Sequence, residues 1–106
     1  MLICGLNSDL SVRRLKGAQR PICPEPERIA VLSAIRWIDY ITVFDELDPI
    51  RLLEMVRPDV HTNGSDYGLD CIEAPTVRKH GGRIHVVERV DAPSTTALLE
   101  RIRALE

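Results

Sequence analysis

Short apolar runs alternate with helical segments along these 106 residues, and this alternation limits the chain to few folds. Residues 2–7 read LICGLN, a continuously apolar run that ends in a turn residue and is typical of a strand buried on both faces. Three later runs, at 40–44, 58–62 and 83–89, also favour strands. Strands separated by helices predict an α/β domain with a mainly parallel sheet.

Helix signals fill most of the segments between these runs. The segment 8–23 is the exception, because it is polar and closes with the proline-rich stretch RPICPEP; we expect an irregular loop there. The expected helices begin at Pro26, at the Asp48-Pro49 pair and at the cap residue Ser94, and a further helix around 73–80 stops at Gly81-Gly82.

The composition excludes several classes of protein. The formal net charge is −2 and the pI is about 5.9, so no global basic field favours nucleic acid. No apolar run approaches the ~20 residues of a membrane span, and no basic region precedes the first apolar run as in a secretory signal. Three cysteines, Cys4, Cys23 and Cys71, lack C-x-x-C spacing and fit a reduced, cytoplasmic chain.

In parallel sheets, ligands bind beyond the carboxyl ends of the strands, so the loops at 8–23, 63–72 and 89–94 are the informative ones. Lys16 and its arginine neighbours in the first loop can grip a phosphate, although a solvated charge cluster explains them better when they are taken alone. Arg28 lies in the first turn of a helix, where the dipole disfavours a cation. It either faces an anion or pairs with a neighbouring glutamate, Glu25 or Glu27.

The last two loops offer groups that suit a nucleotide. Ser94 and Thr95 bring hydroxyls and free N–H groups to a helix start, and Arg89 precedes them; an ordinary helix cap explains the hydroxyls equally well. Asp66 can accept a hydrogen bond from a ribose or base and Tyr67 can stack on one, unless TNGSDYG is only a turn. The histidines show no metal-ligand spacing. A polyphosphate ligand would unite the cations and the helix start at one sheet edge.

The order of these stretches resembles a known superfamily over nearly the whole chain. GLNSDLSVRRLKG, RPICPEPERIAVLSAIRWIDYITVFDELDPIRLLEMVRPDV, NGSDY, GG and STT resemble the nucleotidyltransferases related to cytidylyltransferases, in particular the D-glycero-β-D-manno-heptose 1-phosphate adenylyltransferases. The resemblance implies a Rossmann-like parallel sheet with flanking helices. It also implies transfer of AMP or CMP from ATP or CTP to a sugar or polyol phosphate, such as heptose 1-phosphate, with release of pyrophosphate.

The same resemblance implies Mg²⁺ with the nucleotide, self-association as a homodimer, and roles for individual residues. Phosphate-binding roles fall on Arg28, Arg89, Ser94 and Thr95, positions near ribose and base on Asp66 and Tyr67, and a loop closing over the substrates on Lys16 as the one catalytic candidate.

One family signature is absent: no His-x-Gly-His occurs in these residues. The resemblance therefore implies that 1–106 is a single, N-terminally truncated domain without the first, central strand–helix unit of about 30 residues. We expect this chain alone to be inactive. A cytidylyltransferase for glycerol 3-phosphate or phosphoethanolamine, and a non-catalytic nucleotide-binding remnant, are the alternatives.

Overall fold

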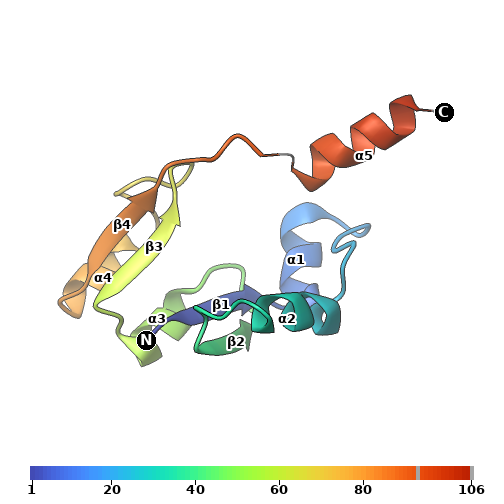
Figure 1. Cartoon of the computed structure of the whole chain (residues 1–106). Helices are drawn as coiled ribbons and strands as arrows, with labels where there is room; N and C mark the ends of the chain where they lie inside the picture. The colour runs from blue at the N-terminus through green and yellow to red at the C-terminus, as the bar shows by residue number, and fades with distance from the viewer. Residues whose placement is uncertain (93, 106) are drawn as a thin grey trace.

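The computed structural model describes residues 1–92 and 94–105 and alternates strands with helices. The elements in chain order (Figure 1) are β1 (Ile3–Asn7), α1 (Asp9–Lys16), α2 (Glu25–Ser33), β2 (Tyr40–Phe44), α3 (Ile50–Val56), β3 (Val60–Gly64), α4 (Ala74–Lys79), β4 (Arg83–Val87) and α5 (Thr95–Ala104). Within the described ranges, no helix is long and apolar enough to cross a membrane.

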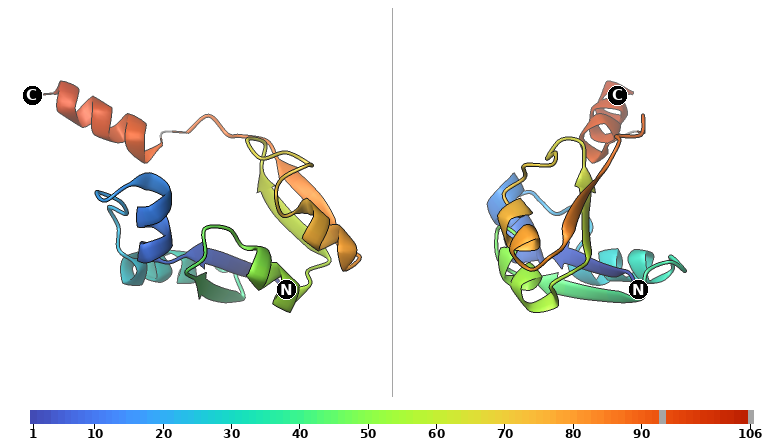
Figure 2. Two further views of the ribbon diagram at one scale, coloured as in Figure 1. Left: turned by 180° about the vertical axis from the view of Figure 1, so that it is seen from behind. Right: turned by 90° about the vertical axis from the view of Figure 1, so that its left-hand side faces the viewer.

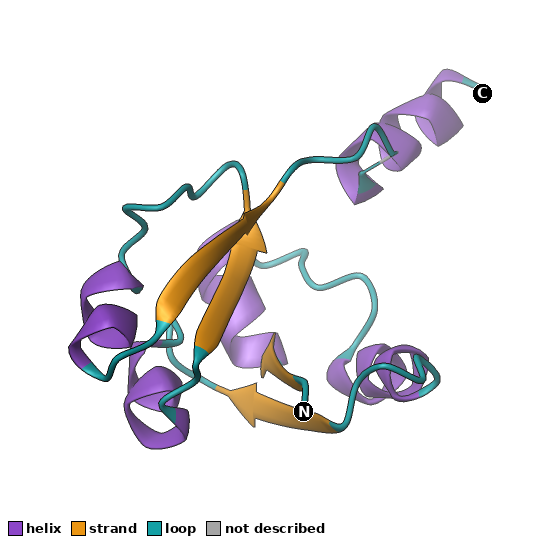
Figure 3. Cartoon of the chain, turned by 60° about the vertical axis from the view of Figure 1, so that its left-hand side comes forward, coloured by secondary structure: helices purple, strands orange, loops and turns teal. Residues whose placement is uncertain are grey.

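All four strands pair in parallel, which confirms the predicted α/β class. β1 pairs with β2 from Ile3–Tyr40 to Asn7–Phe44. β3 pairs with β4 in the same way, with Thr62 opposite His85 in the middle of the register. The strands form two sheets of two, visible as two separate orange pairs in Figure 3, where the sequence predicts a single sheet.

The arrangement of these sheets is open. The Cα radius of gyration is 15.3 Å, whereas a compact domain of this length has a radius of about 13 Å. The two sheets lie apart, and α5 stands away from both of them (Figure 2). Helix α1 packs on β1, α2 on β2 and α4 on β4, and contacts between α3 and α4 connect the two halves. Within the described residues, each two-stranded sheet therefore leaves the outer edge of both its strands unpaired.

The buried core lies beside the second sheet. Its members, each less than a tenth exposed, come from α3, the segment before α4, α4 itself and β4: Leu53, Cys71, Ala74, Val77 and Ile84. The turn before β4 approaches this core closely. A Cβ on Gly82 would collide with the carbonyl oxygen of Pro58, so the second residue of the predicted Gly81-Gly82 stop has to lack a side chain.

The expectation of an irregular loop over 8–23 is wrong, because α1 occupies its first half. Ser8 caps this helix, with its hydroxyl oxygen accepting from the N–H of Ser11 at 3.2 Å. The helix carries an acid in its first turn and basic residues in its last turn, which complements the macrodipole. It ends at Gly17, whose φ of 102° suits glycine.

Several predicted boundaries agree with the structure. The run 40–44 coincides with β2, and the Ser94 hydroxyl oxygen accepts from the N–H of Ala97 at 3.0 Å, so the predicted cap of the last helix is confirmed. Two strands are shifted or shortened. β3 includes the predicted Asn-Gly turn, and β4 ends at Val87, which leaves Arg89 beyond the strand.

Candidate functional site

Arg28 is held by three groups at the carboxyl end of β1. Its Nη2 lies 2.7 Å from Oδ1 of Asp9, its Nη1 donates to the carbonyl oxygen of Asn7 at 2.8 Å, and its Nε donates to that of Cys23 at 3.0 Å. The side chain of Arg28 is only 19% exposed. The glutamate pairing considered for Arg28 is wrong, because its described ion-pair partner is Asp9.

The Asp9 carboxylate responds to this contact. The hydrogen bond from Arg28 holds the pKa of Asp9 below its usual range and outweighs partial desolvation, which acts in the opposite direction. Asp9 also accepts from the backbone N–H of Glu25 at 2.9 Å. The carboxylate thus joins the start of α1 to the start of α2.

Asp66 and Arg89 come together from the loops after β3 and β4. Nη1 of Arg89 lies 3.8 Å from Oδ1 of Asp66, and both side chains are more than half exposed. Tyr67 is also exposed, and its N–H donates to the carbonyl oxygen of Gly64 at 3.1 Å, which closes a turn at the end of β3. A carboxylate, a cation and an exposed aromatic ring therefore lie beyond the carboxyl ends of β3 and β4.

The start of α5 meets a cation that the sequence analysis did not single out. Nη2 of Arg20 donates to the hydroxyl oxygen of Thr96 at 3.2 Å. Ser94 and Thr95, just ahead of Thr96, are both exposed. The sequence contains QRP at 19–21 and STT at 94–96, but Arg20 and Thr96 are 76 residues apart, and no local pattern reveals such a pairing.

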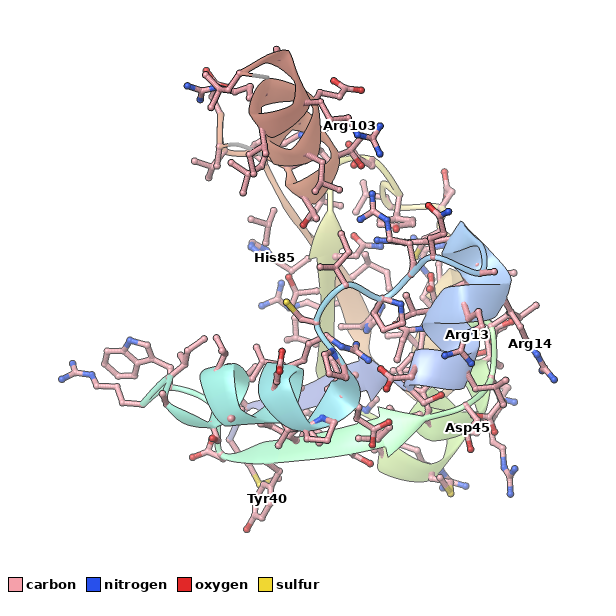
Figure 4. The ribbon with its side chains drawn as sticks, turned by 90° about the vertical axis from the view of Figure 1, so that its right-hand side faces the viewer. Arg13, Arg14, Tyr40, Asp45, His85 and Arg103 are labelled. Atoms are coloured by element: carbon pink, nitrogen blue, oxygen red, sulfur yellow. The ribbon has the colours of Figure 1, made fainter. Side chains whose placement is uncertain are left out.

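Lys16 lies in the last turn of α1 rather than in a loop, and it is exposed. Its neighbours Arg13 and Arg14 project from the same helix (Figure 4). The three cations are therefore carried by the regular backbone of a helix and not by the expected loop, and their side chains are exposed to solvent.

The predicted site residues thus form three groups: Arg28 with Asp9, Asp66 with Arg89, and Ser94 and Thr95 beside Arg20. Between residues that the structure describes, no hydrogen bond or ion pair links one group to another. A shallow hollow of about 470 Å³ is lined by Met1, Asp39 and Tyr40, none of which belongs to the three groups. The gathering of the three groups around one polyphosphate remains a prediction.

Within the described chain, no group of three or more His, Cys, Asp or Glu side chains is arranged to hold a metal ion. Mg²⁺ commonly binds to one or two carboxylates together with substrate phosphates. Asp66 is the one carboxylate among the predicted site residues, so the donor set fits an ion that arrives with a nucleotide better than a resident one.

Parallel strands with polar groups beyond their carboxyl ends are typical of Rossmann-like α/β proteins that bind ligands there. The model of the cytidylyltransferase-like family matches residues 1–101, and the chain belongs to that family.

Its relatives include the bifunctional protein HldE of several bacteria. The chain is 45% identical over 103 residues to that of Syntrophotalea carbinolica and 47% identical over 103 residues to that of Geobacter sulfurreducens, covering 96% of this chain in both. The HldE of Pseudomonas paraeruginosa is 48% identical over 103 residues, again 96% of this chain. These matches cover 21%, 21% and 22% of the relatives, so the chain spans about a fifth of their length.

Proposed function

We propose that this chain is the nucleotide-handling part of a nucleotidyltransferase that transfers AMP, or alternatively CMP, to a sugar phosphate such as heptose 1-phosphate. The observation that carries the proposal is the family match over residues 1–101, together with 41–48% identity to the bifunctional protein HldE. In the reaction, a phosphate oxygen of the acceptor attacks the α-phosphorus of the nucleotide. The bond from that phosphorus to the bridging oxygen breaks, and pyrophosphate leaves.

Positive charge and hydrogen-bond donors are what such a reaction needs from a protein, because the transferring phosphate is highly charged throughout. Arg28, Arg89 and the start of α5 at Ser94 and Thr95 supply such groups, and Lys16 on α1 is the further cation. The ring of Tyr67 is exposed and free to stack on a base.

The proposal assigns to Asp66 a hydrogen bond from the ribose, which requires its contact with Arg89 to loosen. At 3.8 Å between two exposed side chains this ion pair is weak, so a nucleotide phosphate can compete with the carboxylate for Arg89. Mg²⁺, bound mainly by the phosphates of the nucleotide, would shield their charge, while Asp66 serves the ribose.

We further propose that the chain alone binds a nucleotide without transferring it, since the His-x-Gly-His signature is absent from the sequence. Self-association and a cytoplasmic location belong to the same proposal. The free thiols of Cys4, Cys23 and Cys71 support a reducing compartment.

Two measurements test the proposal. Calorimetric titration with ATP and CTP in the presence of Mg²⁺ is expected to show binding, with ATP preferred. Pyrophosphate release is then measured with heptose 1-phosphate, glycerol 3-phosphate and phosphoethanolamine. The chain alone is expected to release none, and a fusion that adds a His-x-Gly-His strand–helix unit before Met1 is expected to release it with heptose 1-phosphate.

Each alternative has its own outcome. A preference for CTP, with release from the fusion only when glycerol 3-phosphate or phosphoethanolamine is present, would identify a cytidylyltransferase. Nucleotide binding with no release from the fusion would indicate a non-catalytic module. Release by the unfused chain would contradict its proposed inactivity, and failure to bind either nucleotide would contradict the proposal as a whole.

A further inference from the structure

The carboxylate of Asp9 is shared by two donors that belong to α2. Its Oδ1 accepts from Nη2 of Arg28 at 2.7 Å and from the backbone N–H of Glu25 at 2.9 Å. The Asp9 side chain is 32% exposed and that of Arg28 is 19% exposed, so solvent screens this pair less than it screens the other arginine pairs of the described chain.

Asp9 itself is fixed by the residues around it. The N–H of Ser8 donates to the carbonyl oxygen of Phe44 at 2.9 Å, and the hydroxyl of Ser11 donates to that of Glu46 at 2.7 Å. Both serines are almost completely buried. The first turn of α1 is therefore bound to the carboxyl end of β2, and the carboxylate of Asp9 has a rigid support.

Arg28 keeps hydrogen-bond capacity after its contacts within the protein are made. A guanidinium carries five N–H groups, and three of them are used by Asp9, Asn7 and Cys23. One N–H remains on each terminal nitrogen. Because the three acceptors lie around a planar group, they fix the direction of these two remaining donors.

We propose that Asp9 is a positioning residue of the nucleotide site, which holds the Arg28 guanidinium at the carboxyl end of β1 so that its two remaining N–H groups are available to a nucleotide phosphate. This inference rests on the proposed function, because the phosphate contact of Arg28 belongs to that function. Asp9 does not touch the nucleotide; it acts through Arg28. The ordering of the guanidinium before binding reduces the entropy that is lost when the phosphate arrives.

The test compares Asp9→Ala with Asp70→Ala in the full chain. Asp70 is a matched control, because its side chain is 96% exposed and its described contact is a 3.6 Å pair with Arg78. Asp9→Asn is the conservative variant, since its amide oxygen can still accept from Glu25 and Arg28. Two quantities are measured: the Arg28 Nε–H resonance by NMR, and the dissociation constant of ATP, expressed per folded chain.

In Asp9→Ala, the Arg28 Nε–H resonance is expected to shift and to exchange faster with water. The ATP affinity is expected to fall about tenfold, as for the loss of one charge-assisted hydrogen bond. Asp9→Asn recovers part of both effects, and Asp70→Ala changes neither. In an Arg28→Ala background, Asp9→Ala has no further effect on ATP affinity, because the residue through which it acts is gone.

Other results would overturn the inference. An unchanged Arg28 resonance, an ATP affinity that stays equal or rises in Asp9→Ala, or an equal loss with and without Arg28 would each show that Asp9 does not act through Arg28. If the wild-type chain binds no nucleotide, the proposed function fails, and the Arg28 resonance alone decides whether Asp9 orders this side chain.

Discussion

Oε2 of Glu54 lies 2.7 Å from Nε2 of His80, so a carboxylate in α3 is tied to the residue that follows α4. Oε1 of the same carboxylate lies 2.6 Å from Nζ of Lys79. Since α3 and α4 connect the two halves of the molecule, this small cluster helps to hold the two sheets in their relative positions.

The Glu54 cluster predicts a loss of stability in acid. Hydrogen bonds from Lys79 and then His80 hold the pKa of Glu54 below its usual range. Because the pKa is lower in the folded state, the contact stabilises the fold above the ordinary glutamate pKa of about 4.3, and this contribution is lost as the pH falls through the folded value. Glu54→Gln is expected to lower the melting temperature at pH 7, with the difference shrinking below about pH 4. A control, Glu100→Gln, alters an exposed side chain of α5; equal pH dependence in all three proteins would contradict the prediction.

The close approach of Gly82 to the core predicts a strong effect of a single methyl group. In Gly82→Ala, the new Cβ would meet the carbonyl oxygen of Pro58 and lie 2.9 Å from Cγ1 of Val77. Such overpacking is expected to cost about 1–3 kcal/mol of unfolding free energy. Gly64→Ala is the matched control, because a Cβ there meets nothing within 4 Å. Urea denaturation of both variants checks the difference, and equal midpoints would refute the predicted collision.

The position of Val77 in the core predicts a loss on truncation. Its side chain is 1% exposed, whereas Val31 on α2 is 69% exposed. Val77→Ala is expected to reduce the unfolding free energy by about 2 kcal/mol, which corresponds to two buried methyl groups. Val31→Ala should stay within about 0.5 kcal/mol of the wild type. The same urea titrations measure both, and similar losses from the two variants would show that the core lies elsewhere.

The proposed nucleotide site predicts different roles for two exposed arginines. Arg89→Ala removes a cation beside Asp66 and is expected to weaken ATP binding about tenfold, together with a weaker dependence on salt. Arg103→Ala removes a cation from the last turn of α5 (Figure 4) and should leave ATP affinity within about twofold, since that end of the helix has the wrong dipole for a phosphate. Calorimetry at two salt concentrations measures both; equal effects would place the phosphates away from Arg89.

The sequence predicted elements best where local chemistry decides the structure. The β-branched and aromatic run 40–44 became β2 without a shift, and Ser94 caps α5 as expected. The sequence does not predict helix α1, because the short, mostly polar stretch DLSVRRLK carries too few apolar residues for a clear apolar stripe. In the structure these residues bury only part of their surface, since Leu10 is 44% exposed and Leu15 is 53% exposed. The cap at Ser8 and the order of charges favour a helix in this segment, whereas the prolines that follow favour a loop.

Pairings between distant residues could not be predicted in the same way. Asp9 and Arg28 are 19 residues apart, and nothing in their local pattern favours Asp9 over the nearer glutamates of α2 as the partner of Arg28. The contact depends on the path that brings the start of α1 against the start of α2, which only the packed structure shows. The sequence predicts Asp66 in the loop after one strand and Arg89 at the end of another, but it does not predict their ion pair.

The hydrogen bond between Arg20 and Thr96 bears on the local stability of α5 and on the order in which the elements fold. Among the described residues, it is the one side-chain hydrogen bond between α5 and the chain that precedes Ser94, and it is exposed. Helix α5 therefore gains little free energy from contacts with the rest of the fold. Helix α4, packed on β4 and α3, has far more to hold it. The amide protons of α5 should therefore exchange with solvent long before those of α4, and the helix start proposed for the phosphates would become ordered last, as the final step of folding or as part of nucleotide binding.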